Sequence, residues 1–141
     1  MIRFVLDASV SAGWLIPDKS SEYAIQVRQR LAEGERAIVP ALWAIEMANV
    51  LAKAVRHGTL STEDAENGVA QLQILLIPGS KIEVDLTAPS VWNVYDAARR
   101  YQLSGYDACY LKLAQEQGLP LATLDKGLRA AATRAGVALL K

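Results

Sequence analysis

The sequence has little of what secreted, disulfide-stabilised or membrane-spanning proteins require. Its 141 residues include one cysteine, Cys109, so no disulfide can form within the chain and a reducing, cytoplasmic location is expected. No apolar run approaches the length that spans a bilayer, and no basic segment followed by an apolar one marks a signal peptide, so no membrane association is expected. The only histidine, His57, precedes Gly58 at the expected end of a helix, where a structural role is expected rather than that of a general base.

The chain also lacks a net charge, which by itself argues against a nucleic-acid-binding protein. The charges are, however, unevenly distributed. From residue 99 onward, three acids (Asp107, Glu116, Asp125) stand against seven basic residues (Arg99, Arg100, Lys112, Lys126, Arg129, Arg134, Lys141). This excess reflects either ordinary solvated helix faces or a basic surface around a site that uses some of those acids.

What the chain does contain is a regular alternation of short apolar runs with helical patterns. Strands are predicted at 2–6, 36–39, 81–84, 119–124 and 137–140, and helices at 9–16, 20–34, 41–58, 61–79, 89–102, 104–118 and 125–136. This alternation is typical of an α/β fold with a parallel sheet and helices on both faces. No linker or repeat divides the sequence, so residues 1–141 are expected to form a single domain.

Two acids follow predicted strands directly. Asp7 ends the apolar run "IRFVL", and Asp125 follows "LPLATL". In parallel α/β sheets, functional groups gather beyond the carboxyl ends of the strands, so both side chains can reach one crevice. The structural alternatives are a turn for Asp7 and a helix N-cap for Asp125.

Two further acids lie within predicted helices. Glu46 is, with Asn49, one of two polar residues between Ala41 and Ala52, so its carboxylate has to be neutralised, paired or bound to a metal. A tertiary salt bridge or a solvent-facing stripe is the alternative. Asp107 follows Ser104 at the spacing of a capping box, which is its own structural alternative.

Together, four carboxylates in one crevice repel one another unless protons or a cation compensate for their charge. A site built from oxygen ligands alone selects Mg²⁺ or Mn²⁺ over zinc, and such sites hydrolyse phosphodiesters. The hydroxyls of Ser9 and Thr123 lie two residues from Asp7 and Asp125, where they can steady a ligand. Structural roles are expected for Cys109, Asp96 and Asp85.

The segments "VLDAS", "WAIEMANVL", "YDACYLKLA" and "ATLD" resemble, in their order and in the length of the chain, the motifs of PIN-domain ribonucleases, and in particular of VapC-type toxins from toxin–antitoxin modules. The resemblance covers essentially the whole chain. It implies a parallel sheet of about five strands and a Mg²⁺- or Mn²⁺-dependent endoribonuclease. Its acidic quartet corresponds to Asp7, Glu46, Asp107 and Asp125, with Ser9 and Thr123 as neighbouring hydroxyls.

The resemblance also implies partners: an RNA substrate, a second copy of the chain in a homodimer, and a small antitoxin. The early helices carrying Trp14, Trp43 and Leu51 are either the antitoxin surface or part of the core. RNA contacts are expected from the basic residues Arg99, Arg100, Lys112 and Lys126.

Two other classes of function are compatible with acids at strand ends. A receiver-type signalling domain also carries a phospho-acceptor aspartate at such a position. It needs paired acids before the strand that carries the aspartate and a lysine at the end of a late strand, and the sequence has neither. A PIN-like binding module without catalysis is the second alternative, although all four acids are present.

Overall fold

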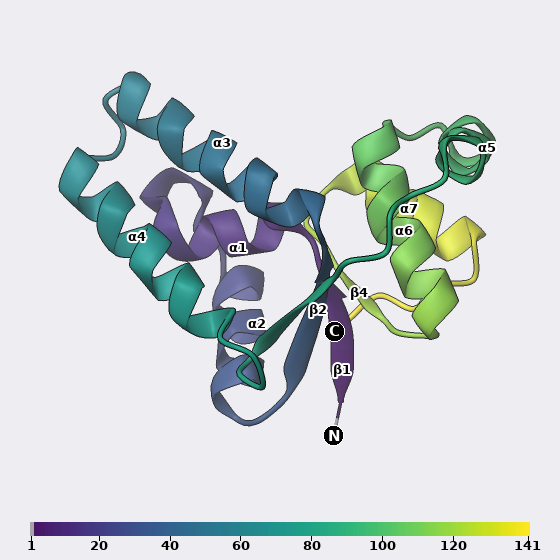
Figure 1. Cartoon of the computed structure of the whole chain (residues 1–141), viewed down its shortest axis with the longest axis horizontal. Helices are drawn as coiled ribbons and strands as arrows, with labels where there is room; N and C mark the ends of the chain where they lie inside the picture. Colours follow the sequence, from purple (N-terminus) through teal and green to yellow (C-terminus); the bar gives the residue numbers. More distant parts are fainter. Residues whose placement is uncertain (1) are drawn as a thin grey trace.

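The computed structural model describes residues 2–141, and its strands form one parallel sheet (Figure 1). The strands are β1 (Arg3–Leu6), β2 (Arg36–Pro40), β3 (Ile82–Asp85) and β4 (Leu121–Ala122), in the order β3-β2-β1-β4. The first strand therefore lies in the middle of the sheet, next to the last one. Segments from the beginning and the end of the sequence are therefore neighbours in the sheet.

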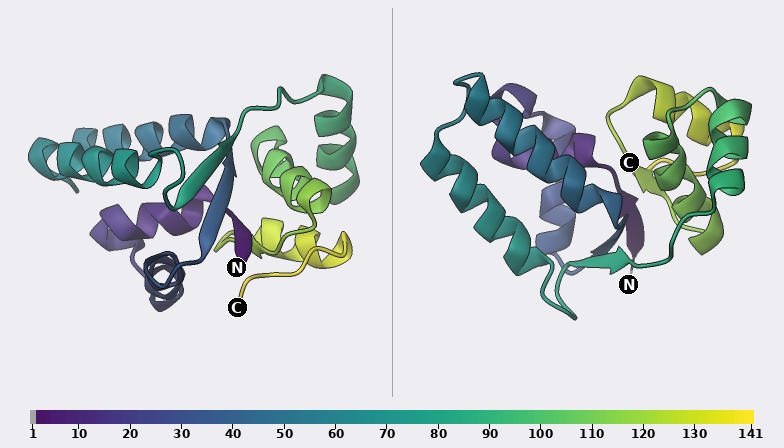
Figure 2. Two further views of the ribbon diagram at one scale, coloured as in Figure 1. Left: turned by 60° about the horizontal axis from the view of Figure 1, so that its bottom comes forward. Right: turned by 45° about the horizontal axis from the view of Figure 1, so that its top comes forward.

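Helices cover both faces of the sheet, as the alternating pattern predicts. The bounds are α1 (Ala8–Leu15), a 3₁₀ turn η1 (Pro17–Lys19), α2 (Glu22–Ala32), α3 (Leu42–Arg56), α4 (Thr62–Leu75), α5 (Val91–Tyr101), α6 (Gly105–Gln117) and α7 (Lys126–Arg134). Figure 2 shows α1 to α4 on one side of the strands and α5 to α7 on the other. The predicted α/β fold with a parallel sheet is thus confirmed.

The sheet has four strands rather than about five. The segment 137–140 forms only a single parallel bridge, between Leu139 and Leu121. Its last carbonyl groups turn to side chains of α2 instead of continuing a ladder: the Tyr23 hydroxyl donates to the Leu140 carbonyl at 2.7 Å, and Arg30 donates to the carbonyl of Lys141. Because β4 is itself only two residues long, it offers no longer edge for pairing.

The core forms where the strands are covered on both faces. Phe4, Val5 and Leu6 of β1 are fully buried, which explains why these three successive residues are all apolar instead of alternating with polar ones. Trp43 and Leu51 are also buried, with 1% and 4% of their surface exposed. The core interpretation of these two residues is therefore right and the partner-surface interpretation is wrong. Trp14 is half-buried, and its indole N–H donates to the Ala24 carbonyl at 2.8 Å.

Side-chain caps start several helices at the predicted residues. The hydroxyls of Ser61 and Ser104 accept hydrogen bonds from Asp64 N and Asp107 N, at 3.0 and 3.1 Å. Such caps satisfy amide groups that have no partner within the helix, and they fix where α4 and α6 begin. Across residues 2–141, none of the helices combines the length and the apolar character needed to cross a membrane.

Candidate active site

A cleft opens at the carboxyl ends of β1 and β4, where the first and last strands are neighbours. Asp7 follows β1 directly, and its backbone N–H donates to the carbonyl of Ala122 in β4 at 3.0 Å. This pairing places the Asp7 side chain, which is only 4% exposed, beside Thr123. The strand order therefore brings together residues that are 116 positions apart.

Two hydroxyls hold the Asp7 carboxylate. Its Oδ2 accepts hydrogen bonds from Ser9 Oγ at 2.6 Å and from Thr123 Oγ1 at 2.7 Å. The same hydroxyls accept from the next loop, since Leu124 N donates to Ser9 and Asp125 N donates to Thr123, at 3.0 and 3.1 Å. This network joins the start of α1 to the β4–α7 loop and fixes the direction of the buried carboxylate.

The Asp125 and Asp107 side chains line the same cleft, and each also lies at the start of a helix. Asp125 Oδ2 accepts from Leu128 N at 2.8 Å and caps α7, as the structural alternative predicts. Asp107 lies in the first turn of α6, after the capping Ser104. This cap uses only one of the two oxygens of the Asp125 carboxylate, which leaves the second oxygen for another contact. The positions of Asp107 and Asp125 at the starts of α6 and α7 therefore place both side chains at the cleft.

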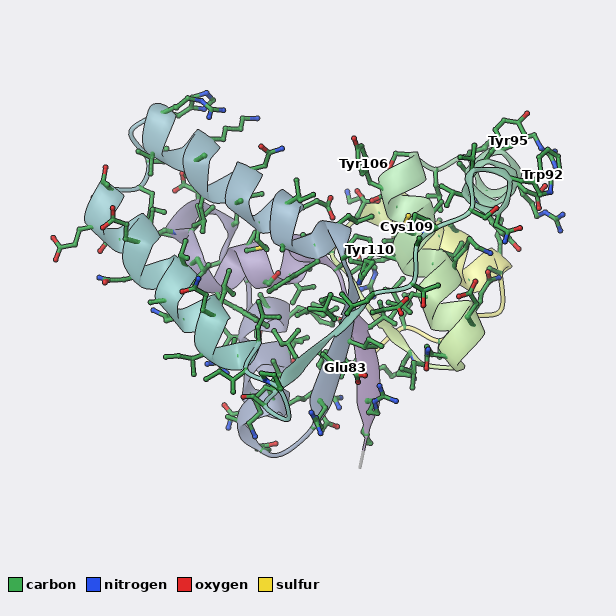
Figure 3. The ribbon with its side chains drawn as sticks, viewed as in Figure 1. Glu83, Trp92, Tyr95, Tyr106, Cys109 and Tyr110 are labelled. Carbon is green, nitrogen blue, oxygen red and sulfur yellow. The ribbon has the colours of Figure 1, made fainter. Side chains whose placement is uncertain are left out.

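Glu46 reaches the cleft from α3, and a tyrosine from the opposite layer holds it. Tyr110 of α6 is fully buried, and its hydroxyl donates to Glu46 Oε1 at 2.6 Å. Figure 3 shows Tyr110 between α6 and the start of α3. Sequence reasoning missed this residue. The available signal was its spacing, because Tyr110 lies three residues after Asp107 on the same helix face.

Burial and mutual repulsion perturb these carboxyls. Burial is the main cause that raises the pKa of Asp7, and the charge of Asp125 raises it further, against the two hydroxyl hydrogen bonds. Burial also raises the pKa of Glu46, and the charges of Asp7 and Asp107 add to it, while the Tyr110 hydrogen bond lowers it. The pKa of Asp107 is raised by burial and then by the charges of Asp125 and Asp7. The four acids therefore form one electrostatic unit.

The cleft has a volume of about 480 Å³, and its lining includes all four acids together with Ser9, Lys19 and Asn49. Within residues 2–141, no three His, Cys, Asp or Glu side chains are close enough together to form a ready-made metal site. The four carboxylates therefore line the cleft without forming a compact cluster. Their chemistry fits a hard divalent cation, because the donors are oxygens only and the charges of neighbouring acids raise the pKa of Asp7, Glu46 and Asp107. Sequence reasoning missed Lys19 as a cleft residue.

The four basic residues expected to contact RNA do not line this cleft in the part of the chain that the structure describes. Arg99 and Arg100 pair with Asp96 on α5, at 2.8 and 3.3 Å, and the Arg99 hydrogen bond is the main cause that lowers the pKa of Asp96. Lys112 pairs with Glu116 at 3.5 Å on α6. Lys126 is exposed at the start of α7, next to Asp125.

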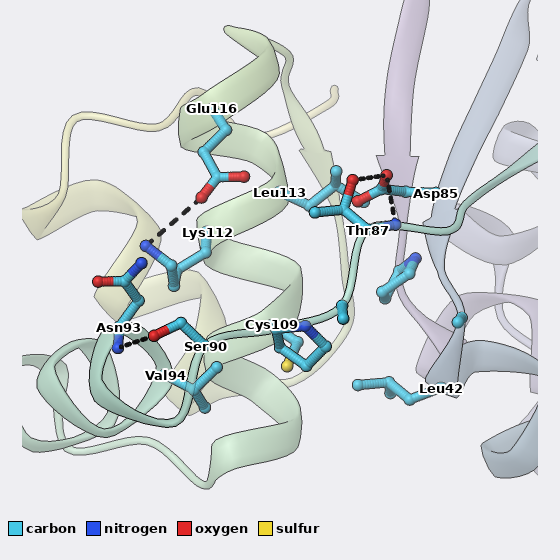
Figure 4. A pocket seen from close by; sticks show the side chains of 14 residues that line it. Leu42, Asp85, Thr87, Ser90, Asn93, Val94, Cys109, Lys112, Leu113 and Glu116 are labelled. Carbon is cyan, nitrogen blue, oxygen red and sulfur yellow. Dashed lines mark hydrogen bonds and ion pairs between the residues drawn. The ribbon is translucent and has the colours of Figure 1, made fainter.

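A second, mostly apolar cavity of about 250 Å³ lies between α6 and the segment that follows β3 (Figure 4). Asp85 lines this cavity instead of the acidic cleft, and its Oδ1 accepts from Thr87 N and Thr87 Oγ1, which confirms a turn role. Cys109 faces the same cavity and is half-buried, so it is less enclosed than a core residue. This cavity contains none of the four candidate acids.

Comparison with known proteins agrees with this architecture. Ribonuclease VapC3 from Pyrobaculum aerophilum is 29% identical to this chain over 127 residues, which cover 90% of this chain and 92% of that protein. The structure of PAE2754 from the same organism superposes with a TM-score of 0.67 at 24% identity, covering 92% of this chain and 84% of that one.

Two more distant structures share the fold. FitAcB from Neisseria gonorrhoeae has a TM-score of 0.66 at 18% identity, covering 98% of this chain and 96% of that one. VapBC2 from Rickettsia felis, bound to a DNA fragment from its promoter, has a TM-score of 0.64 at 14% identity and covers 99% and 98%. The model of the PIN domain matches residues 4–133, so the chain belongs to the PIN domain family.

Proposed function

We propose that this protein is a Mg²⁺- or Mn²⁺-dependent endoribonuclease and the toxin of a toxin–antitoxin module. The observation that carries the proposal is the convergence of four carboxylates from four different elements on one cleft, one of them almost completely buried. Keeping several like charges together is costly unless a cation binds among them. The relative named Ribonuclease VapC3 supports ribonuclease activity.

Asp7, Glu46, Asp107 and Asp125 are the residues that would hold the cation. Bound there, a hard divalent cation would supply Lewis-acid chemistry: it would lower the pKa of a water molecule and would offset charge that develops on the phosphate oxygens. The protein's own contribution is orientation. Ser9 and Thr123 hold one oxygen of Asp7.

Two of the other three ligands are also held by hydrogen-bond donors. Tyr110 holds Oε1 of Glu46, and the cap of α7 holds Oδ2 of Asp125. The hydroxyl and amide donors therefore pre-arrange a ligand set that repulsion would otherwise spread apart.

The substrate of this proposal is RNA, and Arg99, Arg100, Lys112 and Lys126 are proposed as contacts to its backbone outside the cleft. All four lie on α5, α6 or the start of α7, on one side of the sheet. Contacts of this kind make affinity fall as salt concentration rises. Replacing them singly with glutamine should lower the salt dependence of RNA binding, and an unchanged dependence contradicts the assignment.

Two protein partners belong to the proposal. The names of the similar structures FitAcB and VapBC2 support a small antitoxin as one partner. A homodimer is supported by large apolar side chains that the monomer leaves exposed after β3 and on α5: Leu86 (84%), Val91 (88%), Trp92 (66%) and Tyr95 (53%). Sedimentation of the unmodified protein and of Trp92→Ala tests this, since a monomer in both cases contradicts the dimer.

The activity is tested with purified protein and single-stranded RNA, with Mg²⁺ or Mn²⁺ present or removed by EDTA. Cleavage should require the cation and should be lost in Asp7→Asn. Asp64→Asn removes an exposed acid of α4 that is not part of the cleft lining, and serves as the matched control. Labelling of Asp7 by acetyl phosphate without RNA cleavage would support a receiver-type domain instead. RNA binding without cleavage would support a catalytically silent module.

A further inference from the structure

Lys19 is the one cationic side chain that lines the acidic cleft among the described residues 2–141. It carries no ion pair within 4.0 Å in that part of the chain, although Asp7, Glu46, Asp107 and Asp125 share the cleft with it. Lys19 therefore does not neutralise the acids.

The fold holds the backbone of Lys19 in a fixed place. Lys19 ends the 3₁₀ turn that Pro17 begins, and its N–H donates to the Ile16 carbonyl at 2.9 Å. The turn lies directly on α1, because a Cβ added at Gly13 would be 2.7 Å from the Lys19 carbonyl oxygen and 2.9 Å from Ala24 Cβ. Only a glycine at position 13 allows this approach, so the lysine is anchored at the edge of the cleft.

We propose that Lys19 binds a backbone phosphate of the nucleic-acid strand, next to the phosphodiester that is cleaved. The inference rests on the proposed function and adds a residue for binding the substrate. A lysine ammonium is a compact charge with three donors and no acceptor, which suits a phosphate oxygen. The carboxylates repel a polyanion, so an uncommitted cation at their edge supplies the attraction that the acids themselves do not.

The test compares Lys19→Gln and Lys19→Arg with Lys81→Gln. Lys81 precedes β3 at the opposite end of the sheet from the cleft, so its replacement controls for the loss of one positive charge. Lys19→Gln should raise KM for single-stranded RNA about tenfold, the effect of one charge-assisted hydrogen bond, with kcat largely kept. The slope of log affinity against log salt should fall by about 0.7. Lys19→Arg should restore most of the loss.

Equilibrium binding of labelled RNA, with Ca²⁺ in place of Mg²⁺, is measured on the same variants and separates the two proposals. RNA binding that is equal in Lys19→Gln and the unmodified protein, or absent from both, overturns the inference. A rise in cation affinity and cleavage in Lys19→Gln also overturns it, because the lysine would then be neutralising the acids. Binding that depends on Lys19 without any cleavage overturns the ribonuclease proposal alone.

Discussion

Replacing Tyr110 with phenylalanine removes a single oxygen from the contact between the two halves of the site. The Tyr110 ring is fully buried and packs in the core, and phenylalanine keeps that ring. Only the hydroxyl is lost, which donates to Glu46 Oε1 at 2.6 Å. The substitution therefore separates the positioning of Glu46 from the packing of α6.

The expected size of the effect follows from the kind of hydrogen bond. A hydrogen bond to a charged group contributes about 1.5–3 kcal/mol, and Glu46 is only half-buried, so water replaces part of the lost contact. We expect the free energy of unfolding at neutral pH to fall by about 1–2 kcal/mol. Loss of a group that orients a metal ligand typically lowers metal affinity or activity about 10- to 100-fold, and we expect the same here.

The pH dependence of this effect has a definite sign. The Tyr110 hydroxyl favours the charged form of Glu46 and lowers its pKa, against the burial that raises it. The stabilisation by this hydrogen bond is therefore present when Glu46 is charged and is lost as the pH falls through its pKa. The difference in stability between the unmodified protein and Tyr110→Phe should shrink at acidic pH.

Urea denaturation at several pH values and calorimetric titration with Mn²⁺ measure both effects. Tyr106→Phe removes the hydroxyl of a tyrosine that is 66% exposed on α6, outside the lining of the cleft, and is the matched control. The reasoning is refuted if Tyr110→Phe keeps the stability, the Mn²⁺ affinity and the cleavage rate of the unmodified protein.

Three further predictions concern the acids and the turn beside them. Asp7→Asn should abolish cleavage. It should also raise the free energy of unfolding at neutral pH by about 1 kcal/mol, because burial raises the pKa of Asp7 and its charge therefore opposes folding. A lower free energy of unfolding in urea denaturation would contradict this. Mg²⁺ affinity, measured by calorimetry, should rise with pH above the ordinary aspartate range as Asp7, Glu46 and Asp107 lose protons at raised pKa values, and a flat profile would count against a carboxylate site. Gly13→Ala should destabilise the protein by about 1–3 kcal/mol in the same denaturation assay, because the new Cβ would collide with the backbone of Lys19. Unchanged stability would contradict this close approach.

Local signals made much of the fold predictable. The apolar run before Asp7 forms β1, and the serines at 61 and 104 cap the helices that they were expected to start. The structural alternatives for Asp107 and Asp125 also hold, since both lie at helix starts while lining the cleft. A capping role and a site role are therefore compatible, because the cap occupies one oxygen and the strand-to-helix junction directs the residue to the sheet edge.

What sequence reasoning missed depends on contacts between distant segments. Nothing local shows that Tyr110 meets Glu46, which is 64 residues away, or that the turn ending at Lys19 reaches the acids. The segment at 137–140 has a strand-like composition, but side chains of α2 donate hydrogen bonds to the carbonyl groups of Leu140 and Lys141. The apolar sequence around Trp43 likewise did not distinguish a core position from a partner surface, and only the packing between layers shows that Trp43 is buried.

The central claim is that a hard divalent cation binds among these carboxylates. Anomalous diffraction from crystals grown with MnCl₂ tests it most directly, because the signal locates the ion without reference to activity. A manganese peak is expected in the cleft, within coordination distance of an oxygen of Asp7, and the peak should be absent from crystals of Asp7→Asn. A cleft without a peak, in crystals that bind manganese elsewhere, would contradict the account.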